Sequence, residues 1–287
     1  MRLVACIGAA VVLLAAAGCS GSVTGEVSSK TAQKPVPAAT VKVGDQTVIT
    51  DTSGRFSVEK VSTGSQRVAV NAEGYGPYTQ SLEVQKGDNT LNVALEDGTV
   101  TGALRENAVI KKAVKDAQVT VAGKKAVLEG AKFVLAGVPV GSQTLKVVAP
   151  GHETYAQEIT VAPGQNEAEV ELNLTAVETY ARMYQAIQFR HYRDAYQVVH
   201  PDIRRRYSFN AYVKDDKASY PVLSMKVFGT KVLSKWKPSF LDKTYRHVVA
   251  IDRAVRWQDS WGSRTTNDTR HVVNIDGRWY LIYDWRD

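Results

Sequence analysis

The sequence predicts a multidomain protein: two tandem all-β antiparallel sandwiches followed by an α+β domain of helices packed on a curved antiparallel sheet. Residues 21–174 contain an internal duplication, and its segments alternate apolar and polar residues with the period of two that half-buried strands show. Residues 175–287 begin with helical spacing and continue as long alternating runs. This order of elements predicts helices that cover one face of a sheet.

The duplication has a constant offset of 77 residues, which also relates Phe56 to Phe133. A unit of this length is too long for a solenoid repeat and suits a small domain. We therefore expect one sandwich over residues 19–97 and a second over 98–174. The repeated blocks are GSVTGEV and GTVTGAL (21–27 and 98–104), GSQRVAV and GSQTLKV (64–70 and 141–147), and LNVAL and AEVEL (91–95 and 168–172).

The first copy carries a family pattern in PVPAATV at 35–41, TDTSGRF at 50–56 and EGY at 73–75. In this order the motifs resemble the carboxypeptidase regulatory-like domain, a transthyretin-like sandwich grouped with carbohydrate-binding-like folds. The second copy departs from the pattern at Leu128, Ala131 and His152. The resemblance implies a non-catalytic module for scaffolding, spacing or glycan contact.

Polar and aromatic side chains of the sandwiches allow two interpretations. Asp51, in a D-x-x-G turn, could ligate a metal, but such an Asp usually hydrogen-bonds its own backbone. Tyr75, Tyr78 and Tyr155 could form a platform for sugar, although tyrosines at a sandwich edge commonly serve as amphipathic cover. We expect a turn at Asp51 and no metal site.

Residues 1–18 have the features of an export signal. Arg2 is followed by an uncharged apolar run, too short to span a bilayer comfortably, that closes on AAAGCS at 15–20. This resembles the lipobox of bacterial lipoproteins, which implies that Cys19 carries lipid and anchors the protein on the extracytoplasmic side of the membrane. The alternative is an ordinary cleaved signal with an incidental cysteine. Because Cys6 lies in the signal, no disulfide is expected in the mature chain.

Charge separates the last part of the chain from the rest. Residues 176–287 contain 20 Lys plus Arg against 12 Asp plus Glu, a net +8, whereas the whole chain carries +7. All five tryptophans also fall there. Composition therefore predicts a third domain over residues 175–287.

Helical signals open this third domain. Thr175 and Glu178 form a capping-box pattern, and a second helix is expected over 191–200, ended by Pro201. A third helix should follow Ser208. Strands are then expected near 222–235, 243–257 and 269–285, with Trp279, Leu281, Tyr283 and Trp285 on one face of the last.

The order of these elements, the segment ETYARMYQAIQFRHYRDAYQVVHP at 178–201 and the closing DGRWYL at 276–281 resemble the nuclear-transport-factor-two-like superfamily. That resemblance implies a cone of bent sheet around a helix, and the superfamily includes ligand-binding proteins, isomerases and dehydratases. A pocket in the cone would be lined by Tyr184, His191 and Tyr196.

The sequence predicts neither catalytic residues nor a metal site or cofactor. Ionisable groups are present, but no spacing among them forces an acid–base pair, and the histidines are scattered. The groups considered are Asp194, His191, His200, Tyr196, His247 and Asp252.

Basic and aromatic residues of the third domain form a candidate surface for an anionic polymer. The predicted binding residues are Arg204, Arg205, Arg206, Lys235, Trp236, Lys237, Arg256 and Trp257. For an exported protein the expected partners are cell-wall glycan, an anionic envelope polymer or another envelope protein, together with the membrane through Cys19, and not nucleic acid. The alternative is a solvated face with an ordinary excess of cations.

Two functional hypotheses follow. In the first, the protein is a non-enzymatic, lipid-anchored envelope protein whose sandwiches act as a spacer or glycan-contacting scaffold for a basic, aromatic-rich binding domain. In the second, the cone is a small-molecule enzyme of the isomerase or dehydratase kind, which the sandwiches hold away from the membrane. An ionisable pair inside a closed apolar pocket would favour the enzyme.

Overall fold

The computed structural model describes residues 20–218 and 222–283. The predicted signal at 1–18, the lipid site at Cys19 and Trp285 lie outside the described residues. The chain divides into two compact units, the first reaching to Gly98 and the second holding most of the remainder. No helix within the described part is both long and apolar enough to cross a bilayer.

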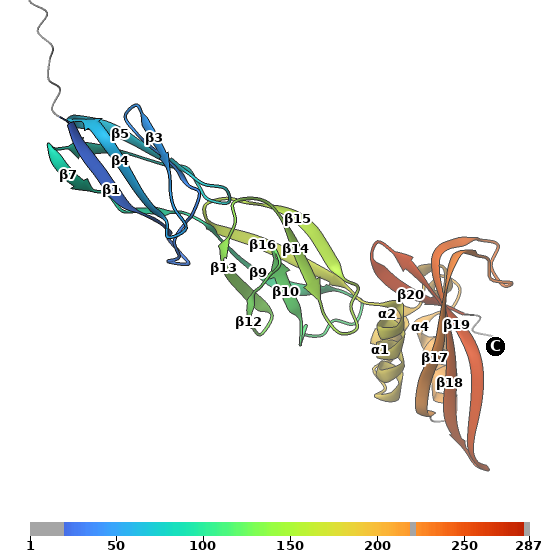
Figure 1. Cartoon of the computed structure of the whole chain (residues 1–287). Helices are drawn as coiled ribbons and strands as arrows, with labels where there is room; N and C mark the ends of the chain where they lie inside the picture. Colours follow the sequence, from blue (N-terminus) through green and yellow to red (C-terminus); the bar gives the residue numbers. More distant parts are fainter. Residues whose placement is uncertain (1–19, 219–221, 284–287) are drawn as a thin grey trace, which may run out of the picture. The chain divides into compact units, whose positions relative to one another are not determined.

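The first unit contains a sandwich of two four-stranded sheets (Figure 1). One sheet has the order β4-β1-β7, with β8 also paired to β1, and the other has the order β3-β2-β5-β6. A core made mostly of valine, with Phe56, fills the space between them. The strands are β1 (Ser20–Ser29), β2 (Thr40–Val43), β3 (Gln46–Ile49), β4 (Arg55–Ser62), β5 (Gly64–Asn71), β6 (Tyr78–Val84), β7 (Gly87–Thr90) and β8 (Val93–Leu95).

The prediction that all strands pair antiparallel is wrong at one place in this sandwich. β7 and β8 run parallel to β1, with Gly21 opposite Gly87 and Val27 opposite Val93. The chain reaches these strands from β6 in the opposite sheet, and such a crossover does not impose the antiparallel direction that a tight hairpin imposes. Alternation along a strand says nothing about the direction of its neighbour, so the sequence pattern could not reveal this pairing.

The second copy builds the same sandwich from sheets β12-β13-β9-β16 and β11-β10-β14-β15. The offset of 77 relates its buried residues to those of the first copy, so the duplication extends to the core. Matched core pairs are Val23 and Val100, Val27 and Leu104, Phe56 and Phe133, Val68 and Leu145, and Leu95 and Leu172. The strands are β9 (Gly98–Asn107), β10 (Gln118–Val121), β11 (Lys124–Lys125), β12 (Val127–Glu129), β13 (Lys132–Val138), β14 (Gly141–Val148), β15 (Tyr155–Val161) and β16 (Gly164–Asn173).

The turn at Asp51 confirms the backbone interpretation of this residue. Its Oδ1 accepts hydrogen bonds from the backbone N–H groups of Ser53 and Arg55, at 2.8 and 2.9 Å. Gly54 completes the turn with φ +72°, and a Cβ there would lie 2.5 Å from the backbone oxygen of Val27. The carboxylate therefore shapes the entry to β4.

Two equivalent strand glycines mark a close backbone approach in each copy. A Cβ on Gly25 would lie 1.7 Å from the backbone oxygen of Leu91, and a Cβ on Gly102 would lie 2.1 Å from that of Ala168. Neither distance can be accommodated without moving backbone. The repeat has thus kept glycine for the same steric reason in both copies.

We expect Gly102→Ala to lower the free energy of unfolding by more than about 3 kcal/mol, at or above the upper range of ordinary overpacking, because backbone must move. Gly123→Ala is the control, since its Cβ would meet nothing within 4 Å and only its left-handed φ of +74° opposes alanine, at about 1–2 kcal/mol. Urea unfolding of the purified variants measures both. Equal losses at the two positions would contradict the steric explanation.

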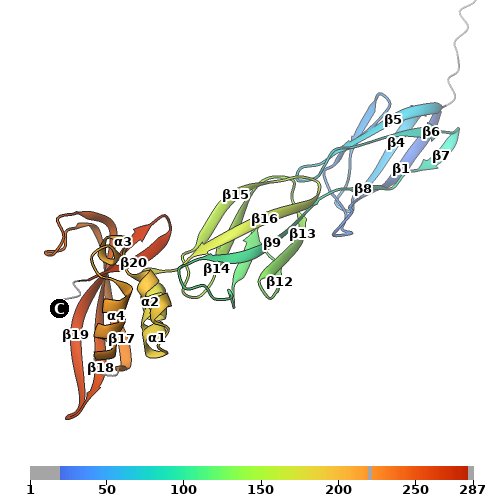
Figure 2. The same cartoon turned by 180° about the vertical axis from the view of Figure 1, so that it is seen from behind.

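The described residues of 176–218 and 222–282 form four helices and a four-stranded antiparallel meander, β17-β18-β19-β20, with α1, α2 and α4 on one face of the sheet (Figures 1 and 2). Tyr180 and Met183 of α1 and Ile251 of β18 lie in the shared core. The elements are α1 (Ala176–Gln188), α2 (Tyr192–Val198), α3 (Pro201–Arg204), α4 (Phe209–Ala218), β17 (Val222–Trp236), β18 (Tyr245–Asp259), β19 (Gly262–Ile275) and β20 (Arg278–Ile282).

Two element boundaries differ from those predicted. Pro201 follows the end of α2 and also opens α3 at its first position, where the missing proline N–H costs nothing. The run predicted over 269–285 is divided by a two-residue turn at Asp276 and Gly277, with φ of +50° and +79°. Positive φ at both central positions is typical of the type I′ hairpin that Asp-Gly favours.

Thr175 caps α1 as predicted, since its hydroxyl accepts a hydrogen bond from the Glu178 backbone N–H at 3.2 Å. The reciprocal bond of a full capping box is absent from this pair. The Thr175 N–H instead donates to the backbone oxygen of Gly151 at 2.9 Å. The Glu178 carboxylate is therefore available for Arg182, whose Nε donates to it at 2.7 Å.

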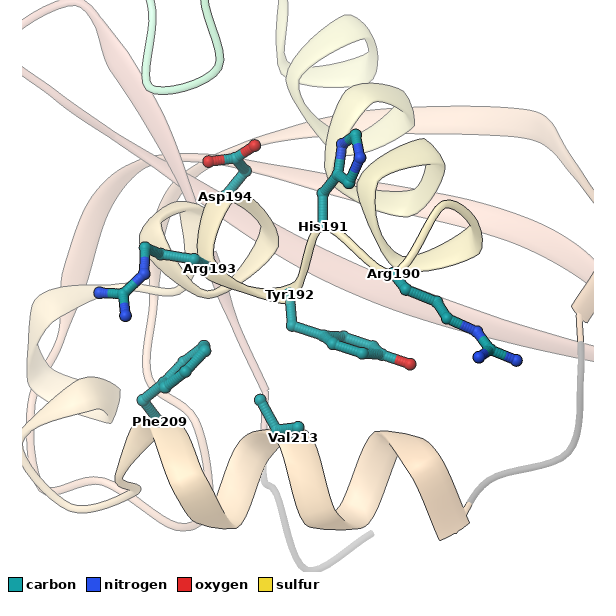
Figure 3. Close-up of a pocket in the computed structure, with 7 residues that line it drawn as sticks. All are labelled: Arg190, His191, Tyr192, Arg193, Asp194, Phe209 and Val213. Atoms are coloured by element: carbon teal, nitrogen blue, oxygen red, sulfur yellow. The ribbon is translucent and has the colours of Figure 1, made fainter.

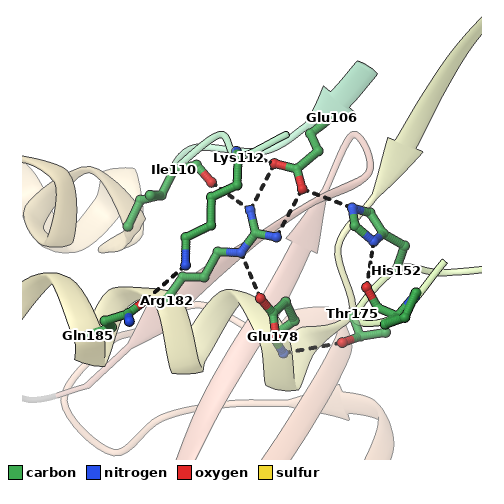
Figure 4. Close-up of polar contacts among 9 residues, drawn as sticks. Glu106, Ile110, Lys112, His152, Thr175, Glu178, Arg182 and Gln185 are labelled. Atoms are coloured by element: carbon green, nitrogen blue, oxygen red, sulfur yellow. Dashed lines mark hydrogen bonds and ion pairs between the residues drawn. The ribbon is translucent and has the colours of Figure 1, made fainter. Parts of the chain in front are cut away.

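Arg182 also joins α1 to the second sandwich, within the second unit (Figure 4). Its two terminal nitrogens donate to both carboxylate oxygens of Glu106, at 2.8 and 2.9 Å. The Arg182 and Glu106 side chains are 7% and 1% exposed, and His152 Nε2 lies 2.9 Å from the same carboxylate. Burial alone would raise the pKa of Glu106, but hydrogen bonds from Arg182, the Lys112 backbone and His152 hold it below its ordinary value.

Further polar contacts surround this ion pair. Arg278 Nε donates to Asn107 Oδ1 at 2.6 Å, and Trp279 Nε1 donates to Glu153 Oε1 at 3.2 Å. Ile110, from the loop after β9, packs against the helical core, and its backbone oxygen accepts from Arg182 at 3.0 Å. The second sandwich and the helical part are consequently held together by buried as well as exposed contacts.

We expect Arg182→Met to lower the free energy of unfolding of the second unit by about 3–5 kcal/mol, because Glu106 would remain buried without its partner. The control is Arg105→Met, at the residue next to Glu106 on β9. Arg105 lies 3.8 Å from Glu169 and both side chains are mostly exposed, so we expect a loss of at most about 1 kcal/mol. Denaturant unfolding followed by tryptophan fluorescence distinguishes them, and similar small losses for both variants would refute the role assigned to Arg182.

Candidate binding surface

The residues predicted to bind an anionic polymer lie in two places. The end of β17 lies near α3, since the Trp236 ring centroid is 6.5 Å from that of Tyr245, whose hydroxyl donates to Asp202, whereas Arg256 and Trp257 lie apart. Arg204–Arg206 lie at and just after α3, Lys235–Lys237 lie at and just after the end of β17, and Arg256 and Trp257 lie toward the far end of β18. Lys235 pairs with Arg246 on β18. Arg246 and Arg256 are ten residues apart on one strand, or about 33 Å at roughly 3.3 Å per residue. The structure therefore does not gather these side chains into one site.

Asp202 partly neutralises the arginines near α3. Its carboxylate accepts from Lys243 Nζ and from the Tyr245 hydroxyl, both at 2.7 Å, and forms an ion pair with Arg205. Burial would raise the pKa of Asp202, but the hydrogen bonds from Lys243 and Tyr245 lower it to about 2. These contacts attach the loop before β18 to α3.

His200 is a structural residue of the same cluster. It is buried, and its Nδ1 accepts the Asp202 backbone N–H at 3.0 Å, which caps α3. Its ring stands edge-on to Tyr245 with 5.1 Å between centroids. Burial lowers the pKa of His200 to about 4, so the imidazole is neutral at pH 7.

The groups on β17 and β18 are also engaged in local contacts. The Trp236 ring stacks on His271 with 4.0 Å between centroids, and Lys237 pairs with Asp242 at 2.5 Å. Lys235 is exposed at the end of the strand. These interactions hold the end of β17 and the loop that follows it.

At the far end of β18, side chains bind across the hairpin to β19. The Arg256 guanidinium donates to Ser263 Oγ at 2.8 Å, and Trp257 Nε1 donates to Thr266 Oγ1 at 2.8 Å. Both contacts join residues on neighbouring strands. They stabilise the hairpin, so a structural role accounts for both side chains without a ligand.

The three residues predicted to line a pocket have different surroundings. Tyr184 is 6% exposed and lies under the Arg253 guanidinium, 5.8 Å from the ring centroid. The Tyr196 hydroxyl donates to the backbone oxygen of Tyr207 at 2.6 Å. His191 is exposed at the turn between α1 and α2. Only His191 therefore lies at the open hollow described next.

This hollow has a volume of about 450 Å³ and lies between the start of α2 and the helix α4 (Figure 3). Tyr192 faces Val213 and Phe209 of α4, so these three half-buried side chains form an apolar floor. Arg190 and Arg193 extend on the two sides of the floor (Figure 3). The arrangement can accept an anionic ligand that also has an apolar face.

Neither Arg190 nor Arg193 forms an ion pair within the part of the chain that the structure describes, and both side chains are exposed. The Arg193 guanidinium lies over the Phe209 ring, 5.1 Å from its centroid, an attractive cation–π geometry. Asp194 also borders the hollow, but its carboxylate points to the opposite side of the α2 turn from Phe209 (Figure 3).

Arg190 adopts a left-handed conformation, φ +60°, at the end of α1. Glycine is the usual residue at such a position. The backbone is fixed there by hydrogen bonds from the Arg190 N–H to Ile187 and from the His191 N–H to Ala186, at 2.9 and 2.7 Å. A long cationic side chain is thus present where the local geometry favours glycine.

The sequence analysis did not select Arg190, Arg193, Tyr192, Phe209 or Val213. The available signal was the run FRHYR at 189–193, in which two arginines alternate with aromatic and histidine residues. Its contribution to a hollow depends on the packing of α4 against α2, which joins Phe209 and Val213 to it. Helical spacing alone does not reveal that contact.

The family comparison concerns the first sandwich. Residues 22–96 match the family model of the carboxypeptidase regulatory-like domain. This match confirms the predicted resemblance for the first copy. No curated protein matches the chain.

Among solved structures, the chain is similar to the Bacillus anthracis TIE protein, with 20% identity, a TM-score of 0.38 and coverage of 55% of this chain and 34% of that one. It is similar to the streptococcal ancillary pilin, with 14% identity, a TM-score of 0.26 and coverage of 55% and 63%. A SEC-C motif containing protein from Rhodopseudomonas palustris gives 13% identity, a TM-score of 0.30 and coverage of 37% and 74%. The chain spans about a third of the length of the TIE protein.

No group of three His, Cys, Asp or Glu side chains is arranged to hold a metal ion within residues 20–218 and 222–283. Of the candidate acid–base groups, His191 and Asp194 both border the hollow, and the others lie elsewhere. His200 caps α3, Asp252 accepts the Thr269 hydroxyl at 2.6 Å, and His247 occupies a strand position with φ +51°.

Acid should destabilise the helical part through His200. The pKa of His200 is about 4 in the folded protein, below the ordinary 6.5. The stability that depends on a neutral His200 is therefore fully present above pH 6.5 and is lost as the pH falls toward 4. We expect a loss of about 2–3 kcal/mol between pH 7 and 4.5. The stability that depends on an ionised Asp202 is lost only at lower pH, between about pH 3.8 and 2, because the pKa of Asp202 is lowered.

Urea unfolding at both pH values measures this loss. His200→Asn keeps an acceptor for the Asp202 N–H but cannot gain a proton, so its stability should change less between pH 7 and 4.5. If wild type and His200→Asn lose the same stability over this interval, His200 is not the responsible group.

Proposed function

We propose that this protein is a non-enzymatic, lipid-anchored component of a bacterial cell envelope that binds an anionic polymer through its C-terminal part. In this proposal residues 1–18 direct export and Cys19 carries the lipid. The sandwiches over 19–97 and 98–174 serve as a spacer or glycan-contacting scaffold. Residues 175–287 form a nuclear-transport-factor-two-like domain that holds the binding site.

The observation that carries the proposal is the pair Arg190 and Arg193 at an open hollow. Many cations of this domain have acidic or hydroxyl partners, as Arg205 has Asp202 and Arg256 has Ser263. Arg190 and Arg193 form no ion pair among the described residues. Unneutralised guanidinium groups attract carboxylates and phosphates and bind them with two parallel hydrogen bonds.

The buried Arg182–Glu106 pair supports the scaffold role of the second sandwich. A domain that binds an extended polymer needs a firm attachment if the load is to reach the anchor. The contacts of Arg182, Arg278 and Trp279 supply such an attachment within the second unit.

Binding should be detectable as thermal stabilisation of the full mature chain. An anionic polysaccharide at ~100 times its dissociation constant should add about 2.7 kcal/mol and raise the unfolding midpoint by a few degrees. Because the attraction is partly electrostatic, about 1 M salt should abolish most of the stabilisation. Neutral dextran is the control polymer, and stabilisation by dextran alone would argue against recognition of charge.

Anchoring should depend on Cys19. In bacterial cells the wild-type protein should fractionate with membranes, and mass spectrometry of the mature amino terminus should show a diacylglyceryl cysteine. Each buried methylene contributes ~0.8 kcal/mol, so two chains hold the protein firmly. Cys19→Ser should release it or leave an unprocessed precursor, and an unmodified Cys19 in the wild-type protein would refute lipidation.

A further inference from the structure

We propose that the hollow between α2 and α4 is a subsite for one segment of an acidic polysaccharide. A sugar ring would lie on the floor of Tyr192, Phe209 and Val213, with its carboxylate or phosphate groups bound by Arg190 and Arg193. This inference rests on the proposed function and names its site and ligand class.

Charge placement is the first argument. The two arginines lie on opposite sides of an apolar floor, and the Asp194 carboxylate points away from that floor (Figure 3). Such placement suits a ligand that carries anionic groups on either side of an uncharged ring, as a polymer of acidic sugars does.

The floor supplies the second argument. Phe209 and Val213 come from α4 and Tyr192 from the first turn of α2, and all three are half-buried. Sugar rings have an apolar face of C–H groups that packs on aromatic surfaces. The volume of about 450 Å³ lies within the ~300–1,000 Å³ typical of small-ligand sites. Because the hollow is open, a bound ring need not be the end of a chain.

Backbone geometry supplies the third argument. Arg190 has a left-handed φ at the end of α1, the conformation that commonly ends a helix. Its position is fixed by two backbone hydrogen bonds of the α1–α2 turn. Arg193 is positioned by the Phe209 ring beneath it. The Arg193 guanidinium and the Arg190 backbone therefore start from restrained geometries, which reduces the ordering cost of binding.

The recess favours a polysaccharide over a flat anionic membrane. A bilayer surface would contact mainly the exposed side chains, such as Arg190 and Arg193, whereas a sugar ring can also contact Tyr192 and Val213, which are half-buried. The carboxylate and phosphate of acidic sugars share the same hydrogen-bond geometry for arginine. The experiment therefore includes one polymer of each kind, and vesicles as a separate arm.

The test measures binding of the full mature protein to polygalacturonate, to a glycosylated poly(glycerol phosphate) and to phosphatidylglycerol vesicles. The charge-removing variant is Arg190→Gln with Arg193→Gln. The matched control, Lys226→Gln with Lys231→Gln, removes the same charge from exposed positions of β17. A third variant, Arg190→Lys with Arg193→Lys, keeps the charge but removes the planar fork. Circular dichroism and the unfolding midpoint establish that each variant is folded.

We expect the Arg→Gln pair to weaken binding of at least one polysaccharide by ~10-fold or more, the Arg→Lys pair by a smaller but measurable factor, and the control by no more than ~3-fold. If the wild type binds a polysaccharide and the Arg→Gln pair binds equally well, the hollow is not the site although the proposed function stands. If no polysaccharide binds, the proposed function itself fails. Vesicle binding that alone depends on Arg190 and Arg193 would replace the polysaccharide by a membrane and overturn the inference.

Discussion

The buried pair of Arg182 and Glu106 is the contact on which the arrangement of the second unit depends. A carboxylate that is 1% exposed is stable only because Arg182 meets both of its oxygens, and Arg182 is in turn oriented by Glu178 in the first turn of α1. This geometry fixes the rotation of α1 against the second sandwich. Since α1 ends at the turn that carries Arg190, the same pair also determines where the candidate binding hollow begins.

The duplication explains where this contact came from. With the offset of 77 residues, Glu106 corresponds to Ser29 and His152 corresponds to Tyr75. In the first copy, the Ser29 hydroxyl donates to the buried carboxylate of Asp97, which follows the last strand of that copy. Both copies therefore use this position to hold the segment that leaves the sandwich. The second copy has exchanged a hydroxyl for a carboxylate, which suits an arginine supplied by the following helix.

The sequence predicted those features that depend on periodicity and local chemistry. The repeat, the alternating strands, the turn at Asp51 and the cap at Thr175 all follow from residue type and spacing, and the family match over residues 22–96 agrees with the motifs. The parallel pairing of β7 and β8 with β1 could not be predicted, because alternation is identical in both directions. Nor could the Arg182–Glu106 pair, whose partners are 76 residues apart and belong to different elements.

The candidate site illustrates a similar limit for charge. Counting cations identified the C-terminal part as basic, but the densest run, Arg204–Arg206, lies beside Asp202, and Arg256 is bound to Ser263. What matters for a ligand is the charge that remains after internal partners are satisfied, and a sequence does not show those partners. Arg190 and Arg193 have no ion-pair partner among the described residues, since Tyr192, Phe209 and Val213 beside them are apolar and the Asp194 carboxylate points elsewhere. A hollow with unneutralised charge is therefore a better guide to binding here than the total charge of the domain.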